Sequence, residues 1–282
     1  MNLETKSEKN IIFLLLLILL LIFIQGFLCR PSIGVSLHLE CHLDFYDNQW
    51  NKIDPPIFCK YGFCSRGIFN TFWLENGFVE TLQTLTLVIA IFFLIKTRNK
   101  LSSIKLFNYF LFIKIIALIY YLGEEISWGQ HFVNWSSPQW FLENNNQKET
   151  NIHNVSNLLD QLPRSLVILW CAFIPLIINY LQNFARINEK LLIIILPSKK
   201  LIIFSILILI FLLPDLIVDK FGIHPKEQNI FDKEDGYFFD MITFNFLKLS
   251  EFQELLFCYY FLFYSIFINK FKLKDINAQE IQ

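Results

Sequence analysis

The chain has 282 residues, of which 54% are apolar and 17% are aromatic, and its formal net charge is −1. This apolar content exceeds that of ordinary soluble domains and is typical of a membrane protein. The sequence has neither a basic stripe nor a Gly-rich phosphate loop, which excludes the usual nucleic-acid-binding classes. We therefore expect the chain to contact membrane lipids and no nucleic acid.

The first predicted element is residues 11–28, an uncharged run long enough to cross about 30 Å of hydrocarbon as a helix. A cleaved signal peptide is the alternative, but the run is long for one and no small-x-small cleavage site follows it. Further membrane-length runs lie near residues 77–95, 106–122, 166–181, 201–218 and 252–268. These runs predict an all-α, polytopic membrane protein with six transmembrane helices.

The basic residues predict the orientation of these helices. Segments 1–10, 96–105, 183–200 and 270–282 hold 13 Lys and Arg in 51 residues, whereas segments 29–74, 128–164 and 219–250 hold 10 in 115. Because cytoplasmic loops are enriched in Lys and Arg, the first set is predicted to be cytoplasmic, with both termini inside. We expect a single integral membrane domain over residues 1–282, with residues 29–74 as a small outer appendage.

The predicted outer loops differ in composition. The first carries Cys29, Cys41, Cys59 and Cys64, for which one or two disulfides outside the cell and free thiols are both open. The second, residues 128–164, has amphipathic pieces rich in Trp and Leu, which predict short helices at the membrane interface.

Acidic residues gather where the predicted helices meet the outer face. Glu80 begins the second helix, Glu124 and Glu125 end the third, and Glu251 and Glu254 begin the sixth. Ionisable groups at membrane depth are costly, so they are functional candidates by default. The alternative for each is a solvated helix end.

Helical spacing refines this arrangement. If the third helix continues through Trp128, then Glu124, Trp128 and His131 share one face. Glu125 instead aligns with Lys114, which either neutralises a carboxylate of another helix or extends to the interface.

Two chemistries fit these residues. Glu80, Glu124, His153, Glu251 and Glu254 are candidate ligands of a divalent metal ion that would activate water. Alternatively, Glu80, Glu124, Glu125 and His153 are candidate general acids or bases without metal. No HxxxH, HExxH or GxSxG spacing decides between them.

Four stretches resemble a family of bacterial multi-pass membrane proteins with no established biochemical function: "ENGFVETLQTLTL", "GEEISWGQHF", "PQWFLENNNQKETNIHN" and "EFQELL". The resemblance covers about residues 74–270 and implies a location in the bacterial inner membrane. It implies as site residues Glu75, Glu80, Glu124, Glu125, Trp128, Gln130, His153, Asn154, Glu251 and Glu254.

The functional expectation follows from these residues together. We expect a metal-assisted hydrolase or transferase on a lipid or lipid-linked substrate, with Trp128, Gln130, His131 and Asn154 as substrate-binding candidates. The alternatives are a cation- or proton-coupled transporter and a non-catalytic assembly protein, so catalysis itself stays open.

Overall fold

The computed structural model describes residues 6–28, 78–101, 105–133, 135–145, 148–181, 194–221 and 249–271, and the regular elements among them are all helices. Residues 1–77 with 214–249 form one compact unit, and residues 78–213 with 250–282 form another. The predicted appendage, residues 29–74, lies outside the described residues. The all-α prediction is confirmed for the part of the chain that is described.

Among the described residues, four segments are long and apolar enough to cross a membrane: Phe78–Lys100, Lys105–Glu125, Gln161–Tyr180 and Leu249–Ile268. The two remaining predicted spans also contain helices, α1 (Lys6–Leu28) and α11 (Leu201–Phe221), with shorter described apolar stretches at Ile12–Ile24 and Leu201–Leu213. The count of six spans and the orientation of the termini remain predictions.

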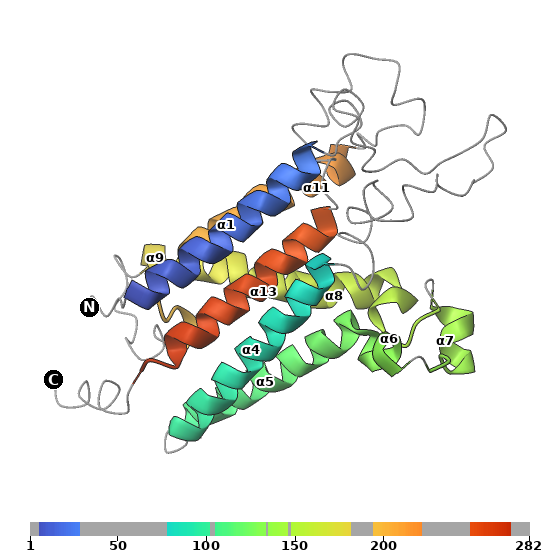
Figure 1. The fold of residues 1–282 in the computed structure, drawn as a ribbon, viewed down its shortest axis with the longest axis horizontal. Helices are drawn as coiled ribbons and strands as arrows, with labels where there is room; N and C mark the ends of the chain where they lie inside the picture. The colour runs from blue at the N-terminus through green and yellow to red at the C-terminus, as the bar shows by residue number, and fades with distance from the viewer. Residues whose placement is uncertain are drawn as a thin grey trace, which may run out of the picture. The chain divides into compact units, whose positions relative to one another are not determined.

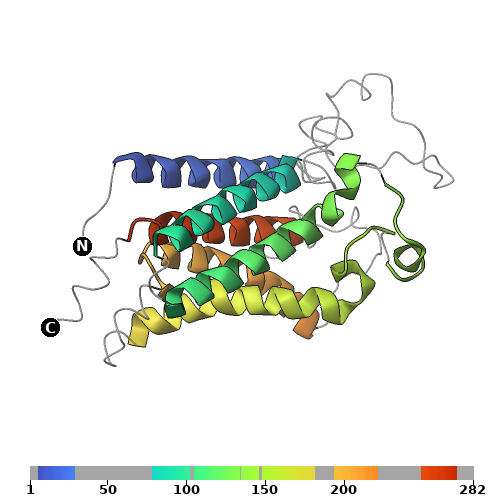
Figure 2. The same cartoon turned by 90° about the horizontal axis from the view of Figure 1, so that it is seen from below.

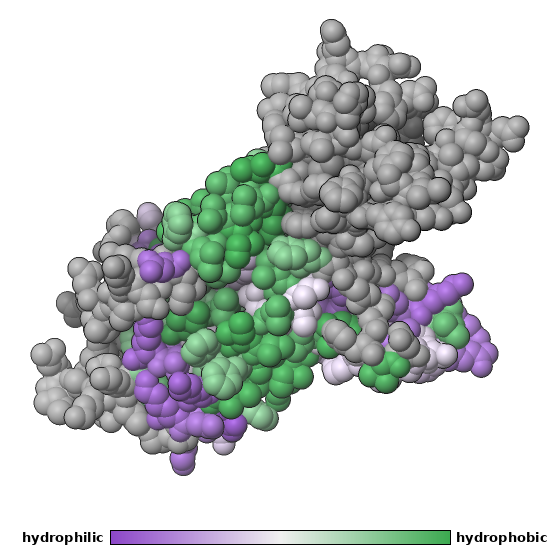
Figure 3. Space-filling model, in the orientation of Figure 1, coloured by the Kyte–Doolittle hydropathy of each residue, from purple (hydrophilic) through white to green (hydrophobic). Residues whose placement is uncertain are grey.

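Helices α4 (Phe78–Lys100) and α5 (Lys105–Glu125) pack side by side (Figures 1 and 2). Near their connection, the Arg98 guanidinium donates from Nε to Asn108 Oδ1 at 2.8 Å. The middle of this pair is covered by hydrophobic surface and the connected end by hydrophilic surface (Figure 3). Exposed apolar side chains on the two helices include Leu85, Val88, Ile89, Phe92, Ile113 and Ile116. Such a surface suits contact with lipid tails.

The next apolar segment is built from α8 (Asn157–Ile168), a π-helical turn η5 (Leu169–Phe173) and α9 (Ile174–Leu181). Ser156 caps α8, because its hydroxyl accepts from the Leu159 N–H. Pro175 has no N–H to donate to the carbonyl of Cys171, and Ser205 Oγ donates to that carbonyl at 2.6 Å instead. A neighbouring helix thus supplies the hydrogen bond that this segment lacks.

Helix α13 (Leu249–Ile268) is the most buried of the long helices, with fifteen buried residues. Its aromatic side chains pack against α11, where Phe263 stacks on Phe204 and Phe252 meets Phe211 edge to face, each pair with ring centroids 4.7 Å apart. Buried aromatic area of this kind dominates the energetics of cores. Helix α13 therefore forms the core around which the carboxylates are placed.

Candidate functional site

The turn that leaves α5 has an unusual backbone. Ser127, Trp128 and Gly129 have φ values of 45°, 54° and 88°, all in the left-handed region. For the two non-glycine residues this conformation is costly and persists only where surrounding contacts impose it. Because α5 ends at Glu125, the condition under which Glu124, Trp128 and His131 would share one helical face is not met. The turn η3 (Ser127–Gly129) leads instead into the short helix α6 (Gln130–Val133).

Gly123 makes room for the Trp128 ring, which folds back onto α5. A Cβ at position 123 would lie 2.9 Å from three carbons of that ring, closer than real Cβ contacts allow. In this position the indole Nε1 donates to Glu124 Oε1 at 2.8 Å. The "GEEISWG" motif therefore positions an indole N–H so that it donates to a buried carboxylate.

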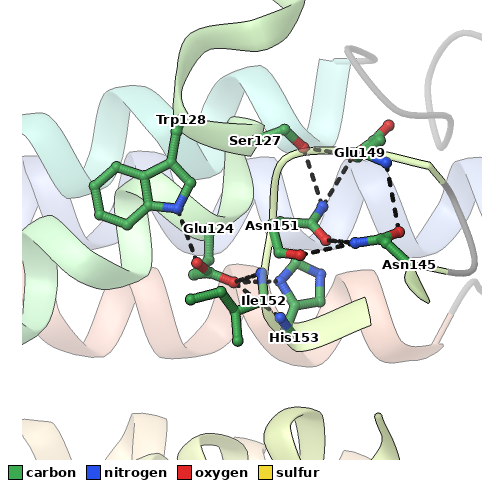
Figure 4. Close-up of polar contacts among 8 residues, drawn as sticks. All are labelled: Glu124, Ser127, Trp128, Asn145, Glu149, Asn151, Ile152 and His153. Carbon is green, nitrogen blue, oxygen red and sulfur yellow. Dashed lines mark hydrogen bonds and ion pairs between the residues drawn. The ribbon is translucent and has the colours of Figure 1, made fainter. Parts of the chain in front are cut away.

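Glu124 binds the loop that follows the short helix α7 (Gln139–Asn144) (Figure 4). Its Oε2 accepts from the backbone N–H of Ile152 at 2.6 Å and from that of His153 at 2.9 Å. His153 Nδ1 lies 3.2 Å from the same oxygen. The loop here forms the 3-10 turn η4 (His153–Val155), which leads into α8. The carboxylate therefore orients the imidazole and connects the loop to the end of α5.

A second network lies beside this carboxylate. Ser127 Oγ donates to Glu149 Oε2, and Asn151 Nδ2 donates to both of these groups at 3.0 Å. Asn145 Nδ2 donates to the backbone carbonyl and the side-chain oxygen of Asn151, both at 2.7 Å. All four side chains are buried. A buried polar network with its members hydrogen-bonded specifies one loop conformation.

Gln130 continues the same loop contact. Its Oε1 accepts from Thr150 N at 2.7 Å and from Ser137 Oγ at 3.1 Å. The side chains of the other two substrate-binding candidates, His131 and Asn154, lie outside the described residues, as does Glu75. Trp128 is 43% exposed, so part of the indole remains accessible beside Glu124.

Glu125 points into a different environment from Glu124. It interacts electrostatically with Glu254, Glu251 and Glu80, and with the guanidinium of Arg164. We call Glu80, Glu125, Glu251 and Glu254 the acidic cluster. Glu80 and Glu251 lie in first turns of their helices, where a helix dipole favours negative charge, whereas Glu125 is the last residue of α5, where the dipole opposes it.

Amide side chains fix the helices that carry this cluster. Gln83 Nε2 donates to the Glu251 carbonyl at 3.0 Å, which connects α4 to α13. Gln253 Nε2 donates to the Phe211 carbonyl at 2.8 Å, and Gln253 Oε1 accepts from Arg164 Nη2 at 2.5 Å. Arg164 and Gln253 were missed by the sequence analysis, because only their position beside the carboxylates distinguishes them from other polar residues.

The predicted site residues thus form two groups. Glu124, Trp128, Gln130 and His153 lie together at the loop, while Glu125 interacts electrostatically with Glu80, Glu251 and Glu254. Within the described ranges, no group of three or more His, Cys, Asp or Glu side chains is arranged to hold a metal ion.

Comparison of the chain with models of known protein families, with curated proteins and with solved structures finds no match. The functional argument therefore depends on the site itself.

Proposed function

We propose that the chain is a multi-pass protein of the bacterial inner membrane in which the acidic cluster binds a proton or a cation during coupled transport. The observation that carries this proposal is the interaction of Glu125 with Glu80, Glu251 and Glu254, with Arg164 as a basic residue acting on it. Four half-buried carboxylates that interact with one another repel when all of them are negatively charged. Such a group binds protons or a cation, which lowers its net negative charge. Each binding event changes the electrostatic interactions among the helices that carry the carboxylates.

Glu125 is the residue on which this uptake depends most. It is the member of the acidic cluster that the dipole of its own helix disfavours, so its negative charge is the one most in need of a cation or proton. Glu125 is also the last residue of α5, and the residue before it, Glu124, binds the loop. A change of charge at Glu125 is therefore coupled to the position of the α5 end.

Glu125→Gln tests this proposal, because it keeps the size of the side chain and removes its charge and its exchangeable carboxyl proton. We expect proton or Na⁺ flux driven by a potassium diffusion potential in proteoliposomes to fall roughly 100-fold, as when a proton-transferring group is lost. An internal pH dye and a Na⁺-sensitive dye measure the two fluxes. Glu143→Gln is the matched control, because Glu143 is an exposed acid on α7 outside the cluster. Wild-type flux equal to that of protein-free vesicles for both ions would overturn the proposal.

The dyad formed by Glu124 and His153 favours a second function, hydrolysis or group transfer on a lipid or lipid-linked substrate. A carboxylate at Nδ1 orients an imidazole so that its other nitrogen can act as a general base or acid. The His153 side chain is 33% exposed, which gives a substrate access to it.

His153→Asn separates the catalytic from the structural role of this dyad. The Asn amide can still donate to Glu124, but it cannot accept a proton at neutral pH. We expect hydrolysis of fluorescent phospholipids or lipid diphosphates by the purified protein, with Mg²⁺, Mn²⁺ or Zn²⁺ added, to fall by about 100-fold or more while the thermal midpoint is retained. Equal turnover by His153→Asn and wild type would remove this function.

A further inference from the structure

The connected end of α4 and α5 carries basic residues and no acid. Between Glu80 and Glu124 the sequence contains no other Asp or Glu, and its basic residues are Lys96, Arg98, Lys100, Lys105 and Lys114. The first four of these lie where the two helices connect, at the hydrophilic end of the pair (Figure 3). Like charges placed this close together repel one another, so a bound anion would stabilise this end of the hairpin.

Two of the five cations have partners within the protein. Lys100 Nζ donates to the Asn269 carbonyl at 2.8 Å, just beyond the end of α13. Lys114 Nζ is 3.6 Å from the centroid of the Trp170 ring and 4.0 Å from that of Tyr264. The predicted pairing of Lys114 with a carboxylate is therefore absent among the described residues. Three cations of the hairpin remain, and the described residues provide no carboxylate for them either.

The guanidinium of Arg98 is held in place between the two helices. Its Nε donates to Asn108 Oδ1 at 2.8 Å, and its Cζ lies 4.9 Å from the centroid of the Phe112 ring. Asn108 and Phe112 are four residues apart, so they project from the same face of α5. Among the described residues, the two Nη groups of Arg98 have no hydrogen-bond partner. A guanidinium that is already ordered binds a further group at a lower entropic cost.

The Nη groups and the start of α5 suit an anion with several oxygens. The two Nη groups of a guanidinium match two oxygens of one phosphate. Lys105 precedes Asn108 by three residues on the same face of α5, so it adds a positive charge beside Arg98. Lys105 is also the first residue of α5, where the helix dipole opposes a positive charge. Its position therefore disfavours the helix by itself and favours an anion bound next to it.

The surroundings of Arg98 indicate a lipid as the source of this phosphate. The Phe112 ring beneath the guanidinium is 44% exposed. The neighbouring exposed apolar side chains are Phe92 and Ile95 of α4 and Leu106, Tyr109 and Ile113 of α5. They continue the hydrophobic surface of the two helices up to the charged end (Figure 3). A phospholipid has a phosphate for the cations and acyl chains for this surface, whereas a free phosphate ion has only the first.

We propose that Arg98 and Lys105 bind the phosphate of an anionic phospholipid whose acyl chains lie along the exposed apolar side chains of α4 and α5. Asn108 and Phe112 are positioning residues, because they orient the guanidinium. The inference requires that α4 and α5 span a membrane, and it is independent of transport at the acidic cluster. A cation in the last turn of α4 also stabilises the helix end, but this role needs neither the ring contact nor the bond to Asn108.

Titration of the purified protein with phosphatidylglycerol or phosphatidylcholine in detergent, with bound lipids counted by native mass spectrometry, tests this site. We expect wild type to bind phosphatidylglycerol roughly 10-fold more tightly than phosphatidylcholine. Arg98→Met should weaken phosphatidylglycerol binding roughly 10-fold. Arg98→Lys should weaken it by a similar factor, because an ammonium keeps the charge but cannot offer two parallel donors to one phosphate.

Two further variants distinguish a built site from general attraction to positive charge. Lys96→Met is the matched control: it removes one charge from the same helix, about 200° around the axis from Arg98, and should retain binding. Asn108→Leu leaves every charge in place and should still weaken binding about 3-fold, because the guanidinium loses its orientation. The thermal midpoint without added lipid shows that each variant is folded.

Three results would overturn the proposal. Equal weakening by Arg98→Met and Lys96→Met would mean that the charged end attracts anionic lipid without a specific site. Equal affinity of wild type for the two lipids would mean that the cations do not bind lipid phosphate. If glycerol 3-phosphate displaces phosphatidylglycerol at an equal concentration, the ligand is a soluble phosphate and the lipid assignment is wrong.

Discussion

Replacing Glu124 by alanine is expected to lower the free energy of unfolding by about 4 kcal/mol, because it removes a buried acceptor and leaves its donors behind. The donors are the indole N–H of Trp128 and the backbone N–H groups of Ile152 and His153, all within 2.9 Å of the carboxylate. These hydrogen bonds are partly buried, and each N–H that loses its partner there costs about 1 kcal/mol, to which the lost contact with the His153 imidazole adds. Unfolding of the purified protein by added SDS in mixed micelles measures this loss.

Glu124→Gln should give an intermediate loss of about 2 kcal/mol, because the amide keeps one accepting oxygen and exchanges the other for a donor. Glu143→Ala is the control: Glu143 is exposed on α7 and accepts from Gln139, and such a substitution changes stability by about 0.5 kcal/mol or less. Equal stability of Glu124→Ala and Glu143→Ala would show that Glu124 does not hold the loop.

The helices could be predicted from the sequence because an apolar run of membrane length leaves few alternatives. A backbone in hydrocarbon must satisfy its own hydrogen bonds, and a helix does this within one segment. The runs at residues 77–95 and 252–268 accordingly match α4 and α13 to within a few residues. The acids at their ends were visible for the same reason, since a charge beside an apolar run stands out.

The sequence does not predict that the side chains of Glu124 and Glu125 lie in different environments. It depends on the left-handed turn at Ser127 and Trp128, and nothing in the local sequence except Gly123 and Gly129 indicates such a turn. Grouping Glu124, Trp128 and His131 on one helical face required α5 to continue through Trp128. The helix ends three residues before that position. The indole still reaches Glu124, by folding back and not by helical spacing.

The loop network was equally hidden in the sequence. Ser127 meets Glu149 across 22 residues and Asn151 across 24, and Gln83 meets Glu251 across 168. Hydrogen bonds over such separations follow from the packing of helices, which composition and spacing do not specify. Asn145, Glu149 and Asn151 lie in the stretch that carries the family resemblance, but only the structure shows that they are buried and bonded to one another.

The two adjacent glutamates differ in their surroundings. Glu124 is saturated by donors and fixes the loop, whereas Glu125 shares a site with three other acids. A carboxylate that already accepts from four groups is a poor site for a proton or a cation, and one surrounded by like charges is a good one. This contrast is why we propose transport at Glu125 and acid–base chemistry at His153.

Arg164→Met is the second substitution with a large expected effect, because it removes a guanidinium that acts on Glu125. At neutral pH we expect a loss of about 1–3 kcal/mol in the free energy of unfolding, since the hydrogen bond to Gln253 is removed and the carboxylates then repel without this half-buried cation. The loss should shrink as the pH falls, because protonation removes the negative charges that Arg164 balances. SDS unfolding in mixed micelles at about pH 8 and about pH 5 measures both values.

The double variant Arg164→Met with Glu125→Gln separates charge balance from hydrogen bonding. If repulsion at Glu125 causes the loss, the second substitution should recover a large part of it, as a coupling energy of about 1–3 kcal/mol. Arg98→Met is the control, because Arg98 binds the neutral amide of Asn108 and its loss should be small and independent of pH. The loss for Arg164→Met could instead be the same at both pH values and unrelieved by Glu125→Gln. Arg164 would then act through its hydrogen bond to Gln253 alone, and the acidic cluster would carry no net charge for it to balance.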